Sequence, residues 1–92
     1  MNIQDTIIIV NLTAGDGQAK KRWRKYEPEL IENHIPYKAV FTEYKGHASI
    51  LALDAISNGY YRIGVFSGDG TLNEVIQGVF NNKLIPIDII SI

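Results

Sequence analysis

The sequence contains no cysteine, which excludes disulfides, thiolate metal sites and cysteine nucleophiles and is compatible with a reducing compartment. It also lacks an apolar run approaching the roughly 18–20 residues that a membrane-spanning helix needs, and its first ten residues lack the pattern of a signal peptide. The formal net charge of −1 gives no electrostatic case for nucleic-acid binding. These absences favour a cytoplasmic protein that does not bind nucleic acid.

Two common phosphate-binding signatures are missing as well. No glycine is followed by Lys-Ser or Lys-Thr, so there is no P-loop, and Gly68-Asp69-Gly70 continues into Thr71-Leu72-Asn73 without completing the dinucleotide pattern GxGxxG. His34 and His47 have no companions at metal-ligand spacing, which argues against a zinc site. No nucleophile or acid–base constellation stands out.

What is present is one alternating pattern along 92 residues, enough for a single small domain. Apolar and β-branched runs predict strands, and 3.6-residue periodicity predicts helices. The expected strands are residues 6–11, 37–42, 62–66 and 84–92, and the expected helices are 18–33, 48–58 and 71–80. Pro28 predicts a kink or break in the first helix near Tyr26 or Glu27. The prediction is an α/β fold with three layers, in which helices cover both faces of a parallel sheet of about four strands.

Glycine-rich loops follow the first and third predicted strands, at residues 12–17 and 67–71. With the flavodoxin-like strand order 2-1-3-4, both loops lie at the carboxyl edge of the sheet and flank the switch point where ligands bind. Glycine lets another molecule approach the backbone, and the helix that follows presents unpaired N–H groups and the positive end of its dipole. The two loops therefore predict one site for the phosphates of a nucleotide.

Structural explanations compete for some of these residues. Thr71 with Glu74 fits a capping box, so those two side chains are explained equally well by a helix start and by a ligand. Asp69 could make an Asx-type turn, and Gly15 could serve only to turn the chain. The basic stretch at residues 20–25 is either a solvated helix face or a surface that contacts anionic lipid headgroups.

Three stretches resemble the diacylglycerol kinase catalytic-domain family, which includes sphingosine kinases and bacterial lipid kinases and is more distantly similar to NAD kinases. Asn11 to Gly17 (NLTAGDG) is similar to the family's Asn-Pro-x-Ser/Ala-Gly-x-Gly loop. Thr42 to Ala48 is similar to the segment that ends the family's second strand and opens its second helix. Ser67 to Val75 (SGDGTLNEV) matches the signature Gly-Gly-Asp-Gly-Thr-Leu-Asn-Glu-Val in all but the first glycine. The third match is specific, whereas the other two are weak alone.

The resemblance implies ATP as the phosphate donor, Mg²⁺ as its metal, and a lipid hydroxyl, as in diacylglycerol, as the acceptor. It places the following residues at the nucleotide: Asn11, Leu12, Thr13, Ala14, Gly15, Thr42, Gly68, Asp69, Gly70, Thr71, Leu72, Asn73 and Glu74. Asp69 would lie near the phosphates or their metal, and no residue is assigned as the catalytic base. Leu12 stands where the family has proline and Ser67 where it has glycine, so Ser67 must tolerate the backbone angles of that glycine.

Family members continue into a β-rich second domain that supplies the lipid-binding surface and the presumed catalytic base. We therefore expect residues 1–92 to be the N-terminal, ATP-binding part of a lipid kinase, with little or no kinase activity alone. An NAD kinase-like phosphotransferase is the alternative enzyme. A third interpretation is a non-catalytic α/β module that pairs with a second copy through its apolar last strand. Peripheral contact with a membrane is a further expectation for the lipid kinase.

Overall fold

The computed structural model describes residues 6–12, 17–66, 69–80 and 88–91, in the last two ranges without the side chains of residues 69, 80 and 88–91. The described residues form β1 (Thr6–Val10), α1 (Gln18–Glu32), β2 (Lys38–Phe41), α2 (His47–Ser57), β3 (Arg62–Phe66), α3 (Asp69–Phe80) and β4 (Asp88–Ser91). This is the predicted alternation of strands and helices. Of the strand predicted at 84–92, residues 88–91 form β4 and the others lie outside the described residues.

The described strands form one parallel sheet in the order β2-β1-β3-β4, which confirms the predicted order 2-1-3-4. β1 pairs with β2 on one side and with β3 on the other, so that Ile8 lies between Ala39 and Gly64. The strand that follows β1 in the chain lies on one side of it, and β3 lies on the other side, so the topological switch point is between β1 and β3. The loops that follow these two neighbouring strands leave from the same edge of the sheet.

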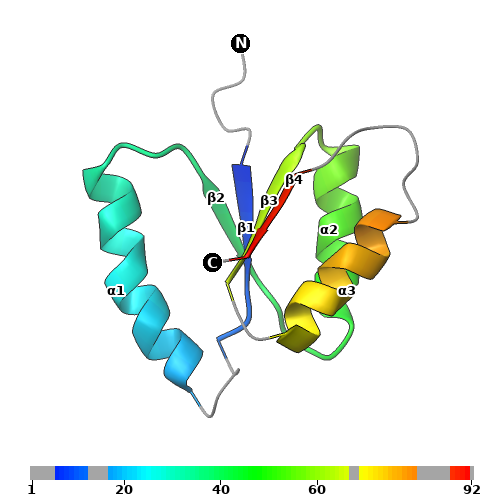
Figure 1. Cartoon of the computed structure of the whole chain (residues 1–92), viewed down its shortest axis with the longest axis horizontal. Coiled ribbons are helices and arrows are strands. Elements are labelled where there is room, and N and C mark those ends of the chain that lie inside the picture. Colours follow the sequence, from blue (N-terminus) through cyan, green and yellow to red (C-terminus); the bar gives the residue numbers. More distant parts are fainter. Residues whose placement is uncertain (1–5, 13–16, 67–68, 81–87, 92) are drawn as a thin grey trace.

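Helices cover both faces of the sheet, as predicted, with α1 on one face and α2 and α3 on the other (Figure 1). Successive side chains of a strand point to opposite faces. Ile7 and Ile9 accordingly pack in the cluster under α2 and α3, while Ile8 and Val10 pack in the cluster under α1. All four are buried. A continuous apolar run in β1 is thus explained by burial on both faces.

Helix α1 runs without a break through Pro28, so of the kink or break predicted near Tyr26 or Glu27 the break does not occur. The N–H that proline lacks would have bonded to the carbonyl of Arg24. Arg24 and Pro28 both lie on the exposed side of the helix, where water can replace that bond. Trp23 and Leu30, buried on either side of the proline, hold both halves of α1 against the sheet.

In helix α2 the sequence predicts that Ile50, Leu51, Ala55 and Ile56 share the buried face. The structure buries Ala55 and packs Leu51 and Ile56 against the core, but Ile50 is 53% exposed, and Ala48 and Ala52 complete a buried stripe of alanines. Small side chains let α2 lie close to the sheet and to α3. Gly59 follows the predicted helix at the position where a terminating glycine is expected. The structure confirms this, because Gly59 has φ 92° and the next amide donates to the carbonyl of Ala55 at 3.0 Å.

In α1 the sequence predicts a stripe of Trp23, Leu30, Ile31 and His34. Trp23 and Leu30 are buried as predicted, but Ile31 is 62% exposed and His34 lies beyond the helix end.

All three helices begin at the edge of the sheet where the strands end (Figure 1). Gly17 and Gly46, the residues just before α1 and α2, have φ of 89° and 91°, angles that residues with a Cβ rarely adopt. These glycines let the chain turn sharply from strand to helix. None of the helices in the described part of the chain is long and apolar enough to cross a membrane.

Candidate functional site

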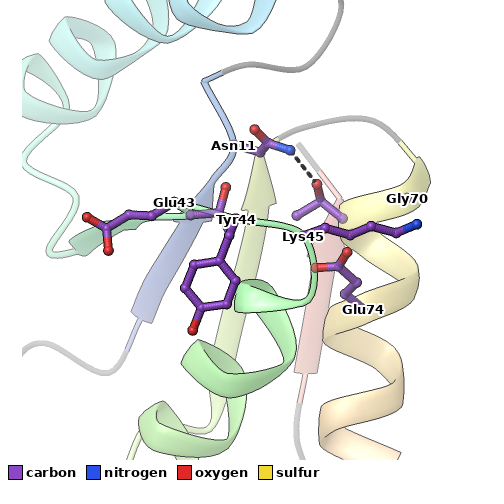
Figure 2. A pocket seen from close by; sticks show the side chains of 8 residues that line it. Asn11, Glu43, Tyr44, Lys45, Gly70 and Glu74 are labelled. Carbon is purple, nitrogen blue, oxygen red and sulfur yellow. Dashed lines mark hydrogen bonds between the residues drawn. The ribbon is translucent and has the colours of Figure 1, made fainter.

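A pocket of about 280 Å³ lies at the carboxyl edge of the sheet, between the end of β1, the β2–α2 turn and the start of α3 (Figure 2). This is the edge where the two glycine-rich loops were predicted to converge. Its volume is close to the lower end of the range for small-molecule sites. The residues that line it are Asn11, Thr42, Glu43, Tyr44, Lys45, Gly70, Thr71 and Glu74.

The side chains of Asn11 and Thr71 join the two loop regions. Asn11 extends the ladder of β1, since its backbone amide donates to the carbonyl of Phe66 at 3.2 Å. Its side-chain Nδ2 donates to Oγ1 of Thr71 at 3.1 Å (Figure 2, dashed line). Thr71 is only 6% exposed, so this bond satisfies a hydroxyl that is buried. The residue that opens the first loop is thereby tied to the first turn of α3.

This arrangement corrects the capping interpretation of Thr71. Helix α3 begins at Asp69, so Thr71 is its third residue and lies inside the first turn, not at the cap position. Glu74 lines the pocket one turn later. Its backbone carbonyl accepts a bond of 2.6 Å from Oγ of Ser49, which fixes α3 to the start of α2.

The β2–α2 turn forms the opposite wall. The amide of Thr42 donates to the carbonyl of Val10 at 2.9 Å, so Thr42 sits beside the end of β1. The amide of His47 then donates to the carbonyl of Tyr44 at 3.1 Å, closing a four-residue turn. Gly46 has φ 91° and ψ −11° in it, the angles of the third residue of a type II turn. Lys45 lies at the tip, and its side chain extends toward α3 (Figure 2).

The charges around the pocket suit an anion with a bound cation. The first turn of α3 has backbone N–H groups without helical partners and carries the positive end of the dipole. Lys45 adds a positive charge, and Glu43 and Glu74 each add a carboxylate. Among the described residues no group of three or more histidines and acids could hold a metal by itself. A Mg²⁺ ion that comes with phosphates, however, needs only one or two carboxylates, and Glu74 fits that requirement.

A second pocket, of about 320 Å³, lies on the α2 side of the sheet near the amino ends of β1 and β2. Ile7 and Lys38 line it from the strands, and Asp54 and Asn58 line it from the last turns of α2. No sequence pattern predicted it. It is slightly larger than the first pocket, but it lies beside the C-terminal end of α2, which does not favour anions.

The sequence profile described as the diacylglycerol kinase catalytic domain matches residues 5–92. The chain belongs to this family. The resemblance carried by the three motif stretches is therefore confirmed, and the fold and the family agree.

Similar proteins support the same assignment. Over 74 residues the chain is 35% identical to YtlR of Bacillus subtilis, provisionally named a lipid kinase, covering 77% of this chain and 24% of that protein. It is 36% identical over 74 residues to sphingoid long chain base kinase 5 of Saccharomyces cerevisiae, covering 79% of this chain and 11% of that one. A crystal structure of a diacylglycerol kinase from Bacillus anthracis superposes with a TM-score of 0.75 and 26% identity, covering 99% of this chain and 34% of that chain. The chain thus spans a quarter or less of these two curated relatives and about a third of the solved structure.

Five of the residues that the resemblance assigned to ATP line the first pocket of this diacylglycerol kinase family chain: Asn11, Thr42, Gly70, Thr71 and Glu74. Leu12 and Leu72 are partly buried, with their side chains packed against the two core clusters, and neither is among the residues that line the pocket. Asn73 is exposed and is not among the residues lining the pocket. Thr13, Ala14, Gly15 and Gly68, together with the side chain of Asp69, lie outside the described residues, as does Ser67.

Three lining residues, Glu43, Tyr44 and Lys45, were not predicted. The family motif was carried over only at Thr42, because the three residues after it match no fixed type. The available signal was Gly46. A glycine directly before a helix at the carboxyl edge places its preceding residues in a tight turn, next to the loops already suspected.

Proposed function

We propose that this chain is the N-terminal, ATP-binding part of a lipid kinase, which transfers the γ-phosphate of ATP to a lipid hydroxyl such as that of diacylglycerol. The hydrogen bond between Asn11 and Thr71 is the observation that carries the proposal. It brings the ends of two loops, 60 residues apart in sequence, to one pocket at the switch point of the sheet. A capping residue would not need this partner from another strand.

Each wall of the pocket has a task in this proposal. Backbone N–H groups around Gly70 bind the phosphates, and the absence of a Cβ there lets them approach the helix start. Lys45 balances phosphate charge, and Glu74 holds Mg²⁺ through its carboxylate. ATP supplies the γ-phosphate and Mg²⁺ neutralises charge that develops during its transfer. Such a reaction depends chiefly on positioning and electrostatic stabilisation, which a pocket built from loops and a helix N-terminus can provide.

In this proposal the lipid acceptor is bound by other parts of a longer protein, since the match covers only 24% of YtlR and 34% of the solved structure. The chain alone accordingly has little or no kinase activity. The exposed basic residues of α1 supply a surface for anionic headgroups: Lys20, Lys21, Arg22, Arg24 and Lys25. Self-association through the last strand stays a prediction.

Phosphate transfer to competing acceptors tests the proposal. The protein encoded by the complete gene is incubated with labelled ATP, Mg²⁺ and, separately, diacylglycerol, a sphingoid base or NAD. We expect label in a lipid and none in NAD, and no turnover above background from the 92-residue chain. Label in NAD, or in no lipid tested, would contradict the assignment to the lipid kinases.

A further inference from the structure

His47, the first residue of α2, bonds to the turn that forms one wall of the pocket. Its Nδ1 accepts a hydrogen bond of 2.9 Å from the backbone amide of Glu43. Its ring stacks on that of Tyr44, with centroids 4.4 Å apart and 13° between the planes. Both contacts reach back across the turn, to residues that line the pocket.

Together with the backbone hydrogen bonds at both ends of the turn, these contacts restrict its conformation. The amide of Thr42 is already committed to Val10, and that of His47 to Tyr44. The bond to His47 occupies the amide of Glu43, one of the four backbone donors between those two anchors. Because Nδ1 accepts, the imidazole is neutral and carries its proton on Nε2. The imidazole thus holds Glu43 through a hydrogen bond and Tyr44 through ring stacking, next to Lys45 at the tip of the turn.

We propose that His47 is a positioning residue for the nucleotide pocket, which acts by fixing the turn that bears Lys45. It does not line the pocket itself. This inference rests on the proposed function, because it assumes that the pocket takes ATP. It adds that affinity for the nucleotide depends on a hydrogen-bond acceptor at the position of Nδ1.

Substitutions that move this acceptor separate positioning from folding. In His47→Asn the side-chain oxygen falls where Nδ1 lies, whereas in His47→Gln it falls near Nε2, one atom further out. His47→Leu keeps bulk and removes the acceptor. His34→Asn is the matched histidine control, since His34 follows the far end of α1 and asparagine tolerates its φ of 56°.

For each variant the dissociation constant of ATP with Mg²⁺ is measured by calorimetry, and exchange of the Glu43 amide is followed by NMR without nucleotide. We expect His47→Leu and His47→Gln to bind ATP about tenfold more weakly, as one lost hydrogen bond implies. In both variants the Glu43 amide should exchange with solvent faster than in the wild type. His47→Asn and His34→Asn stay close to the wild type in both measurements. The ¹⁵N shifts of His47 in the wild type report a proton on Nε2 alone.

The outcomes distinguish the two proposals. If the wild type binds ATP and His47→Leu binds it equally well, the positioning role is wrong while the proposed function stands. Equal weakening in His47→Asn and His47→Gln, which are both polar, would also overturn it. If the wild type binds no ATP, both the proposed function and the positioning role are wrong. Loss of Glu43 amide protection in His47→Leu would then show only that the bond stabilises the start of α2.

Discussion

Gly70 lies in the first turn of α3 and lines the pocket, and nothing lies within 4 Å of where a Cβ would be. Its φ is not in the left-handed region. Neither packing nor backbone angle therefore demands glycine here, and alanine is the better helix former. The remaining explanation for glycine at position 70 is that another molecule approaches the backbone there.

Gly70→Ala should lower affinity for ATP without lowering stability. The added methyl group occupies space over the helix start, so the dissociation constant should rise about tenfold, the equivalent of roughly 1.4 kcal/mol. The free energy of unfolding should be unchanged or higher by up to about 1 kcal/mol. Calorimetric titration and chemical denaturation of the same samples measure both. Unchanged ATP affinity would leave Gly70 without a role in binding.

Tyr37 is the residue with the clearest electrostatic signature. Its hydroxyl donates to Oε2 of Glu27 at 2.7 Å, joining the approach to β2 with α1. Burial, and then the hydrogen bond and charge of Glu27, raise the pKa of Tyr37 from 10.0 to about 12. The fold therefore favours the neutral phenol. Its contribution to stability is complete below pH 10 and is lost as the pH rises from there through about 12.

Comparison with Tyr37→Phe over this range tests that contribution. Near pH 9 the wild type should be more stable by about 1 kcal/mol, since the variant lacks the bond to Glu27. The difference should shrink steadily as the pH is raised from about 10 to about 12. Urea unfolding at several pH values supplies the free energies. If the difference in unfolding free energy between wild type and Tyr37→Phe stays constant above pH 10, the stabilisation does not depend on protonation of the phenol, and this explanation is wrong.

At the scale of the elements, the contact between α2 and α3 is set by Gly78. A Cβ there would lie 2.7 Å from the backbone oxygen of Ser49 and 3.1 Å from its Cα. Backbone atoms cannot rotate away as a flexible side chain would. The same two helices are joined by the bond from Ser49 to the carbonyl of Glu74. Since Thr42 and Lys45 precede α2 while Gly70 lies on α3, this contact also sets the width of the pocket.

Gly78→Ala should lower the free energy of unfolding by about 1–2 kcal/mol, because forced separation of the helices outweighs the gain in helix propensity. Gly70→Ala is the control, being the same substitution in the same helix without the clash. Thermal and chemical unfolding of the two variants measure the contrast. Equal effects on stability would mean that α2 and α3 are not packed as closely as the structure has them.

The errors in sequence prediction also belong to this scale. Periodicity located every helix and predicted that Ala55 is buried, but it also placed Ile50 in the core, whereas the structure buries the smaller Ala48 and Ala52. A single sequence does not reveal how closely a helix approaches its neighbours. The break at Pro28 was wrong for a related reason, since tertiary anchoring by Trp23 and Leu30 overrides the local preference.

For the whole molecule, the parallel sheet and its two covered faces followed from alternation and the handedness of crossovers, whereas the strand order, which the structure confirms, came from the analogy with flavodoxin-like folds. Half of the pocket followed too, because two glycine-rich loops had to share the carboxyl edge. The wall made by Glu43, Tyr44 and Lys45 did not, since those residue types carry no pattern and only the folded turn brings them to Gly70 and Thr71. The family could be predicted from the motif at residues 67–75, and the profile match over residues 5–92 confirms it.

The central claim is that the two loop regions form a single ATP site, and an NMR titration tests it most directly. The amide signals of the ¹⁵N-labelled chain are followed as ATP with Mg²⁺ is added. We predict that Asn11 and Leu12, which follow β1, and Gly70 and Thr71, in α3, shift together with one common dissociation constant. Asn58, in the second pocket, should stay unmoved. Shifts confined to one of the two loop regions, or centred on Asn58, would contradict the account.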